Sequence, residues 1–262
     1  MSVKEFINRN SNINLVFVSG GPGLSSISFN GLMSLKEKYS LHFIDPMGTN
    51  SELIEIPTYK NLLIEVKESI KHLDNVILCG HSFGGIQAVD IASDNLENIK
   101  GLIIIGSPMS TNAFSILGQN FEKGITENQN LISDKLKNEP TDETYKEWFY
   151  EYRNFYFNPK KADEFISIIM NDSVCVKSYS EAIVESSQKQ EKLEKLKSIN
   201  IPKLFITGSL DQVMPPDSAQ HESKLGGLKL EIIKDAGHFV HYECPEETIE
   251  VINNFLTNEG NK

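Results

Sequence analysis

Apolar residues gather in six short runs, separated by longer segments with helical periodicity. Each run is nearly continuous in Val, Ile, Leu or Phe, which is the pattern of a strand buried on both faces of a parallel sheet. The runs cover residues 14–18, 41–45, 75–79, 101–105, 203–207 and 229–233. Helices must cover both faces of such a sheet, so the pattern predicts an α/β fold with a mostly parallel, doubly wound sheet.

The segments between the runs show where these helices lie. In residues 58–73 apolar side chains recur at spacings of three and four, which predicts a helix with one face on the sheet. The last helix is expected over residues 245–257, because it opens with Pro-Glu-Glu, a favourable first turn. About a dozen residues precede the first core strand, so that edge of the sheet has room for at most one short strand.

One long stretch breaks the alternation of strand and helix. Between residues 107 and 201 the pattern is helical throughout, and a structureless loop of that length is implausible. We therefore predict a core domain of residues 1–108 and 200–262 with a helical cap, residues 109–199, inserted after the strand at 101–105. Such an insertion lies over the carboxyl ends of the strands, where ligands bind in this fold class.

Composition excludes several classes of function. The chain of 262 residues carries a net charge of −11 and only two arginines, so nucleic acid is an unexpected partner. The N-terminus lacks the apolar core of a signal peptide and no run is long enough to span a bilayer, which predicts a cytoplasmic protein without a membrane partner. Its three cysteines have neither disulfide nor metal spacing. The sequence leaves the oligomeric state open.

The run at 75–79 continues into Gly80-His81-Ser82-Phe83-Gly84 and then directly into a helical pattern. A sharp turn from strand to helix forces its central residue into a strained conformation, so that small neighbours are needed. The turn raises the serine hydroxyl above the sheet edge, where a base can reach it. This context predicts that Ser82 is a nucleophile; by itself, the pentapeptide would fit an ordinary glycine-rich turn.

Two further strands are followed by the partners that a serine nucleophile needs. Asp211 follows the run at 203–207, and His238 follows the run at 229–233. The order Ser, Asp, His, with each residue just beyond its own strand, is that of an α/β-hydrolase sheet. His238 is the expected base and Asp211 the residue that orients it. Asp235 and Asp217 are the alternatives for the acid.

Taken together, these motifs resemble those of α/β-hydrolase-fold serine hydrolases over nearly the whole chain. Within that superfamily, Ser19-Gly20-Gly21-Pro22-Gly23 resembles the His-Gly-Gly-Pro-Gly turn of proline iminopeptidases and related hydrolases. Ser19 replaces the usual histidine. The segment 45–50, Asp-Pro-Met-Gly-Thr-Asn, departs from the Asp-Gln-Arg/Leu-Gly-Thr/Ser-Gly that is typical of those peptidases.

The elbow geometry and the resemblance together imply an oxyanion hole. The N–H of Phe83 follows the nucleophile directly, and the resemblance implies Gly21 as the second donor, with Leu24 in reserve. Leu24, Trp148 and Tyr152 are predicted to line the substrate pocket. Glu147 and Glu151, four residues apart on the cap, are candidates for binding a substrate amine, although a solvated helix face with Lys partners explains them better.

We therefore predict a serine hydrolase that cleaves a small ester or amide through an acyl-Ser82 intermediate. The alternatives are an aminopeptidase similar to proline iminopeptidases, a biosynthetic thioesterase or acyltransferase, a C–C bond hydrolase with the same triad, and a binding protein without turnover. The expected partner is a small molecule or a short peptide. Neither a metal nor another cofactor is expected, since His238 cannot serve both as the base and as a metal ligand beside His241.

Overall fold

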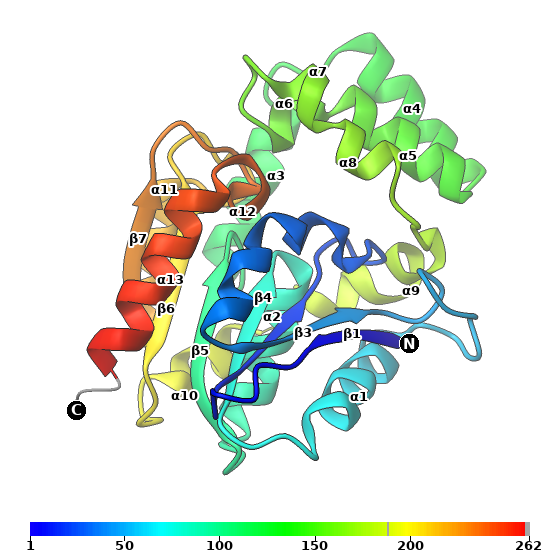
Figure 1. Ribbon diagram of the computed structural model, residues 1–262. Helices are drawn as coiled ribbons and strands as arrows, with labels where there is room; N and C mark the ends of the chain where they lie inside the picture. Colours follow the sequence, from blue (N-terminus) through cyan, green and yellow to red (C-terminus); the bar gives the residue numbers. More distant parts are fainter. Residues whose placement is uncertain (188, 260–262) are drawn as a thin grey trace.

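The computed structural model describes residues 1–187 and 189–259. Residue 188, inside the predicted cap range, and residues 260–262, at the end of the predicted core range, lie outside the described residues. The described part of the chain forms one sheet of seven strands in the order β1-β3-β2-β4-β5-β6-β7 (Figure 1). The strands are β1 (Ser2–Phe6), β2 (Asn14–Val18), β3 (Ser40–Asp45), β4 (Val76–His81), β5 (Ile99–Ile105), β6 (Lys203–Gly208) and β7 (Lys229–Ile233).

The six predicted strands are confirmed, with ends that differ from the prediction by at most two residues. All six pair in parallel, as their continuous apolar patterns indicate. The single short strand allowed at the N-terminus is β1, which runs antiparallel to β3 at the edge of the sheet.

Helices cover both faces of the sheet, and each face has its own buried cluster. The first cluster packs helices α1 (Tyr59–Ile70), α2 (Phe83–Ser93), α10 (Gln190–Leu196) and α11 (Pro216–Gly226) on one face. On the other face the second cluster packs η1 (Ser26–Glu37), α12 (Val240–Glu243) and α13 (Pro245–Glu259). The two helices predicted at 58–73 and 245–257 are therefore present as α1 and α13.

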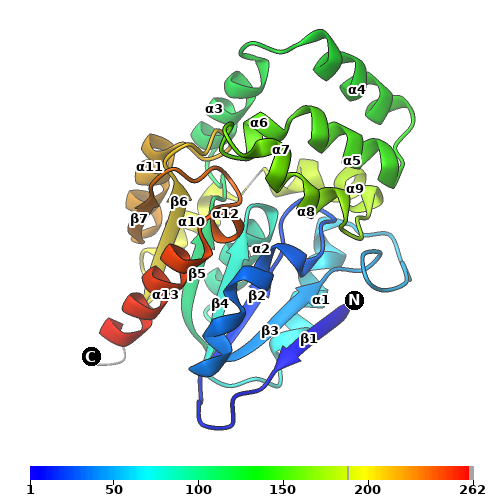
Figure 2. The ribbon, with the colours of Figure 1, turned by 45° about the horizontal axis from the view of Figure 1, so that its top comes forward.

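A helical cap lies between β5 and β6. It contains α3 (Thr111–Glu122), α4 (Glu127–Asn138), α5 (Asp142–Glu151), α6 (Arg153–Tyr156), α7 (Ala162–Phe165), α8 (Ser167–Met170) and α9 (Val176–Ser186). Both ribbon views show α4–α8 set apart from the sheet on the side of α12, which follows β7 (Figures 1 and 2). The chain returns to the core before residue 200, because Leu193 and Leu196 of α10 belong to the first core cluster.

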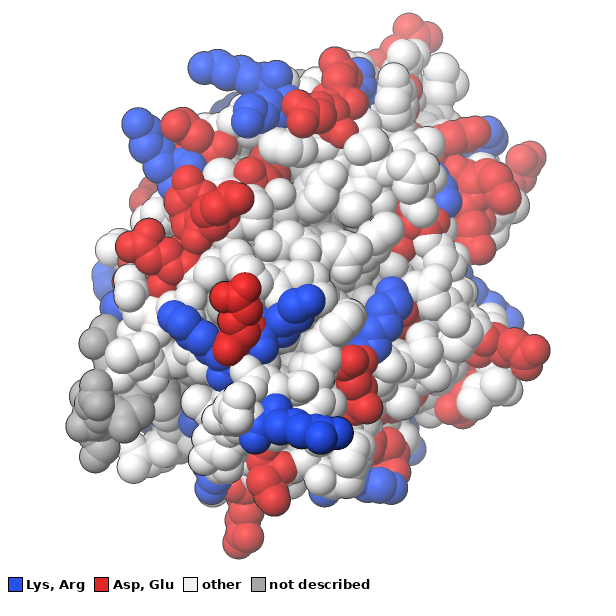
Figure 3. Space-filling model, in the orientation of Figure 1, with Lys and Arg blue, Asp and Glu red and all other residues white. Residues whose placement is uncertain are grey.

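Two further features, the hydropathy of the helices and the distribution of surface charge, bear on the expectations from composition. Within the described residues, no helix is long and apolar enough to cross a bilayer. On the face drawn in Figure 3, Lys and Arg side chains lie among Asp and Glu and do not form one continuous basic patch.

Candidate active site

Ser82 lies at a strained turn between β4 and α2. Its backbone has φ 51° and ψ −119°, a conformation that a residue with a side chain rarely adopts. The neighbouring glycines make the turn possible: a Cβ on Gly80 would lie 2.4 Å from the Gly84 carbonyl oxygen, and one on Gly84 2.2 Å from that of Val18. The strand, the turn and the helix therefore meet too closely for any larger residue at these two positions.

His238 and Asp211 form a buried pair beyond the ends of β7 and β6. The Nδ1 atom of His238 lies 3.1 Å from Oδ2 and 3.2 Å from Oδ1 of Asp211. Asp211 is held in turn by the backbone N–H groups of Val213 and Met214, each 2.9 Å from its Oδ1. Since an acceptor lies at Nδ1, the ring proton is placed there and Nε2 is left free to accept a proton.

The two alternative acids predicted from the sequence do not reach the histidine. Asp235 has an exposed side chain, 72% accessible, that lies 4.0 Å from the ammonium group of Lys234. Asp217 is exposed in the first turn of α11. Of the three aspartates, only Asp211 is buried against His238.

Ser82 and His238 line one cavity of about 920 Å³ beneath the cap. No hydrogen bond joins the two side chains within the described residues, and contacts of this kind tighten when substrate binds. Gly21 and Phe83 line the same cavity. Neither of their backbone N–H groups has an acceptor among the described residues, and Phe83 is the first residue of α2, whose N-terminus favours negative charge. The sequence-predicted oxyanion donors thus both border the space next to Ser82.

Two more histidines, His81 and His241, are buried near His238. His81 is completely buried and lies 3.1 Å, through Nε2, from the carbonyl oxygen of His238. Burial lowers its pKa well below the ordinary value, and it also lowers the pKa of His241 to about 3. Both rings are therefore neutral; His81 contacts the His238 backbone, and Nε2 of His241 lies 3.0 Å from the Ser28 hydroxyl. The described residues contain no group of three His, Cys, Asp or Glu side chains that could hold a metal.

Glu243 connects the His238 loop to the cap, a role that the sequence did not reveal. Its Oε1 accepts the N–H of Gly237 at 3.0 Å and its Oε2 accepts the N–H of Asn158 at 2.8 Å. Burial raises the pKa of this carboxyl to about 7. A single carboxyl group thus fixes the residue before the proposed base and the cap segment that covers it.

The cap supplies most of the cavity lining, but only three of the five residues predicted to form the substrate pocket belong to that lining. Leu24, Trp148 and Tyr152 line the cavity. Glu147 and Glu151 do not: both border a separate surface groove, and Glu147 pairs with Lys135 at 2.6 Å. The prediction of an amine-binding pair was therefore wrong. Residues four apart do share a face of α5, but the inner face carries the aromatics and the glutamates lie on the outer one.

Further cap residues line the cavity. They are Phe114, Leu117 and Phe121 of α3, Tyr145 and Phe149 of α5, Tyr156 of α6, and Tyr179 and Ile183 of α9. Tyr156 lies close to the proposed base: its ring centroid is 5.7 Å from that of His238. The residues of α3 and α9 come from helices far apart in the sequence, so no local sequence pattern connects them to the site.

Comparisons with known proteins agree with this architecture. The model of the alpha/beta hydrolase family matches residues 15–251, and the chain therefore belongs to that family. The chain is similar to the proline iminopeptidase of Saccharolobus solfataricus, 22% identical and covering 95% of this chain and 86% of that protein. It is also similar to 3-oxoadipate enol-lactonase 1 of Acinetobacter baylyi, 25% identical and covering 85% of this chain and 80% of that protein.

A solved structure shows the same fold. A thermophilic esterase from Thermogutta terrifontis superposes with a TM-score of 0.74, covering 98% of this chain and 93% of that chain at 15% identity. The resemblance inferred from the motifs, to α/β-hydrolases with relatives among proline iminopeptidases, is confirmed. The protein is a hydrolase of the α/β-hydrolase fold.

Proposed function

We propose that the protein hydrolyses esters of apolar acyl groups through an acyl-Ser82 intermediate. Ser82 attacks the ester carbonyl carbon while its proton passes to Nε2 of His238. The ester C=O becomes an oxyanion, which the N–H groups of Gly21 and Phe83 stabilise. The tetrahedral intermediate then collapses: the bond to the leaving oxygen breaks, and the proton on His238 goes to the departing alcohol.

The second half of the reaction mirrors the first. His238 takes a proton from water as the water oxygen attacks the acyl-serine carbonyl carbon. Collapse of that intermediate releases the carboxylic acid and returns the proton to Ser82. Asp211 stays ionised and stabilises the imidazolium formed in both halves.

The choice of an apolar acyl group as substrate is based on the composition of the cavity lining. None of the described residues that line the cavity is Asp or Glu, and its one cation is Lys137. Apolar and aromatic side chains make up most of the rest. Burial of a protonated amine without a carboxylate costs several kcal/mol or more, whereas burial of an apolar acyl chain gains about 0.8 kcal/mol per methylene. The lining therefore supports a neutral acyl group and gives a free amine no partner.

This observation ranks the alternatives. The aminopeptidase hypothesis relied on a carboxylate pair to hold the substrate amine, and Glu147 and Glu151 lie outside the cavity. Thioesters and acyl transfer proceed through the same acyl-enzyme, so they are close variants of the proposed reaction. A binding protein without turnover would have no use for the strained Ser82 turn, which costs roughly 1–3 kcal/mol.

The test compares p-nitrophenyl esters of increasing acyl length with prolyl p-nitroanilide, using wild type and Ser82→Ala. We expect kcat/KM to rise from the acetate to the butyrate and hexanoate esters, with negligible hydrolysis of the prolyl anilide. Ser82→Ala should hydrolyse none of them above the rate of the buffer. A prolyl anilide cleaved faster than every ester would contradict the proposal, as would an acetate ester preferred over all longer ones.

A further inference from the structure

The cap holds the loop between β2 and η1, which carries the proposed oxyanion donor Gly21. The Tyr145 hydroxyl of α5 donates to the Pro22 carbonyl oxygen at 2.9 Å. The N–H of Cys175, at the start of α9, donates to the Gly23 carbonyl oxygen at 2.8 Å. Within the loop itself, the Ser19 hydroxyl donates to the Leu24 carbonyl oxygen at 2.8 Å. Two of these three carbonyl groups are therefore bound by the cap.

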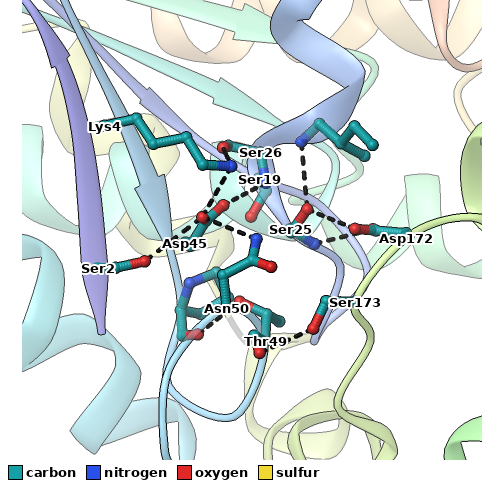
Figure 4. A network of polar contacts seen from close by, with 12 residues as sticks. Ser2, Lys4, Ser19, Ser25, Ser26, Asp45, Thr49, Asn50, Asp172 and Ser173 are labelled. Atoms are coloured by element: carbon teal, nitrogen blue, oxygen red, sulfur yellow. Dashed lines mark hydrogen bonds and ion pairs between the residues drawn. The ribbon is translucent and has the colours of Figure 1, made fainter.

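Asp172 adds the only charged contact in this set. It follows α8, and its Oδ2 accepts the N–H of Ser25 at 3.0 Å while its Oδ1 accepts the Ser25 hydroxyl (Figure 4). Asp172 is 5% exposed, and no Lys, Arg or His pairs with it among the described residues. A buried carboxylate without a cation is costly. Burial is also the main reason that its pKa rises to about 6, with the charge of Asp45 acting in the same direction.

A second carboxylate holds the next residue from the opposite side. The N–H of Ser26 donates to Oδ1 of Asp45 at 2.7 Å. Asp45 belongs to the core and is itself held by Lys4 at 3.0 Å and by the Asn50 amide at 2.9 Å. Figure 4 shows Asp172 and Asp45 on either side of the Ser25–Ser26 segment. The cap and the core thus each fix one of two consecutive amides.

The cap and this loop are packed so closely that no side chain could be added between them. A Cβ on Gly23 would lie 2.1 Å from the Cys175 carbonyl oxygen, and one on Gly48 2.5 Å from the Cys175 sulfur atom. Packing this close transmits a small movement of the segment 172–175 to the turn that carries Gly21. An oxyanion donor is effective only when it is held at hydrogen-bond distance from the place where charge develops.

We propose that Asp172 is a positioning residue for the hydrolase reaction, which holds the oxyanion loop to the cap through Ser25 so that the Gly21 N–H faces the oxyanion. The inference depends on the proposed function. In this arrangement the core is fully active only when Asp172 and Cys175 of the cap are docked on the oxyanion loop, because the cap and the core hold that loop jointly. Asp172 touches neither the substrate nor the reacting atoms.

The test is Asp172→Asn, an isosteric change that turns one of the two acceptor oxygens into a donor facing Ser25. We expect kcat for p-nitrophenyl butyrate to fall about 10- to 100-fold with KM changed less than about threefold, since part of one donor's effect is lost. A trifluoromethyl ketone forms an oxyanion adduct with the serine, and its affinity should fall by the same factor as kcat. The matching methyl ketone should bind unchanged.

Ser173→Ala is the matched control. It removes a neighbouring bond between cap and core, from the Ser173 hydroxyl to the Thr49 carbonyl oxygen at 2.8 Å, without touching the oxyanion loop. Its kcat should equal that of wild type. Ser25→Ala is a second variant, which keeps Asp172 and deletes one of its two donors; we expect a smaller loss of kcat with the same pattern.

The outcomes separate this inference from the proposed function. A lowered melting temperature with unchanged kcat in Asp172→Asn would mean a purely structural role and overturn the inference, as would equal losses in Asp172→Asn and Ser173→Ala. A loss confined to KM would overturn it too. Wild-type protein that neither hydrolyses the esters nor binds the trifluoromethyl ketone would overturn the proposed function, and the inference with it.

Discussion

At the scale of single residues, the site is defined by which polar atoms are buried and what they face. Ser82 is identifiable from sequence because the turn that exposes it needs glycines at fixed positions, and Gly80 and Gly84 are in contact with backbone. Asp172 is not identifiable in this way. It lies 147 residues from Ser25, and no local pattern marks it.

Asp211→Asn tests the orienting role of the buried carboxylate. The side-chain oxygen of Asn can still accept the N–H groups of Val213 and Met214, which turns its amide N–H toward Nδ1 of His238. The imidazole then carries its proton on Nε2 and cannot take one from Ser82. We expect kcat for p-nitrophenyl butyrate to fall by a factor on the order of 10³–10⁴, with KM nearly unchanged.

The controls for this prediction are Asp217→Asn and Asp235→Asn, which change exposed aspartates on either side of the pair. Both should keep the wild-type rate. Full activity of Asp211→Asn, together with a large loss in one of the controls, would transfer the orienting role to that residue.

At the scale of elements, the strands and the helical nature of the cap were predictable, but the faces that the cap helices turn toward the cavity were not. A buried parallel strand has an unbroken apolar run, whereas a cap helix divides its apolar residues between its own core and the cavity. In α5 the faces were assigned incorrectly because Glu147 and Trp148 are adjacent in sequence, yet Trp148 lines the cavity and Glu147 borders the outer groove. Only the three-dimensional packing of the cap distinguishes them.

Gly118 of α3 offers a test of the cavity as the acyl site. It belongs to the lining, and a Cβ at this position would meet nothing within 4 Å. In Gly118→Leu we expect kcat/KM for the hexanoate ester to fall several-fold while that for the acetate ester stays unchanged, because the new side chain takes up space needed by a long chain. The helix should also gain about 0.5–1 kcal/mol of stability.

Gln119→Leu is the control, since it adds the same side chain one residue further along α3 at an exposed position outside the lining. It should leave the ratio of the two rates unaltered. If the ratio of kcat/KM for the hexanoate and acetate esters is the same in Gly118→Leu and wild type, the acyl chain lies elsewhere.

At the scale of the whole molecule, the sequence predicted the sheet, its edge and the insertion, because each depends on local apolar patterns. It did not predict the buried carboxylates that join distant parts of the chain. Glu222 of α11 illustrates them: it is fully buried, and its Oε1 accepts the N–H of Ser110, which caps α3, at 3.0 Å. Contacts of this kind depend on the assembled fold, so no segment read alone contains them.

Glu222 makes the stability of the protein depend on pH. Burial raises its pKa from 4.5 to about 7, so the folded state binds a proton that the unfolded state has lost between these values. The Glu222 carboxyl therefore contributes its full stabilisation of the folded state below pH 4.5, and this contribution is lost as the pH rises through 7. Relative to wild type, we expect Glu222→Gln to gain on the order of 3 kcal/mol in unfolding free energy between pH 4.5 and pH 8.

Urea unfolding of wild type and Glu222→Gln across this pH range measures the difference in unfolding free energy. The contributions of titratable groups present in both proteins cancel in that difference. Glu164→Gln, at an exposed position on α7, is the control and should run parallel to wild type. A Glu222→Gln curve that also runs parallel would mean that the Glu222 carboxyl is not buried as the fold requires.

The most direct test of the proposed hydrolase reaction is whether Ser82 is the activated nucleophile. Wild type and Ser82→Ala are treated with a fluorophosphonate, and the intact mass and the modified peptide are determined by mass spectrometry. We expect one adduct on the wild-type protein, located at Ser82, and none on Ser82→Ala. An adduct on another residue, or a native protein that stays unmodified, would contradict it.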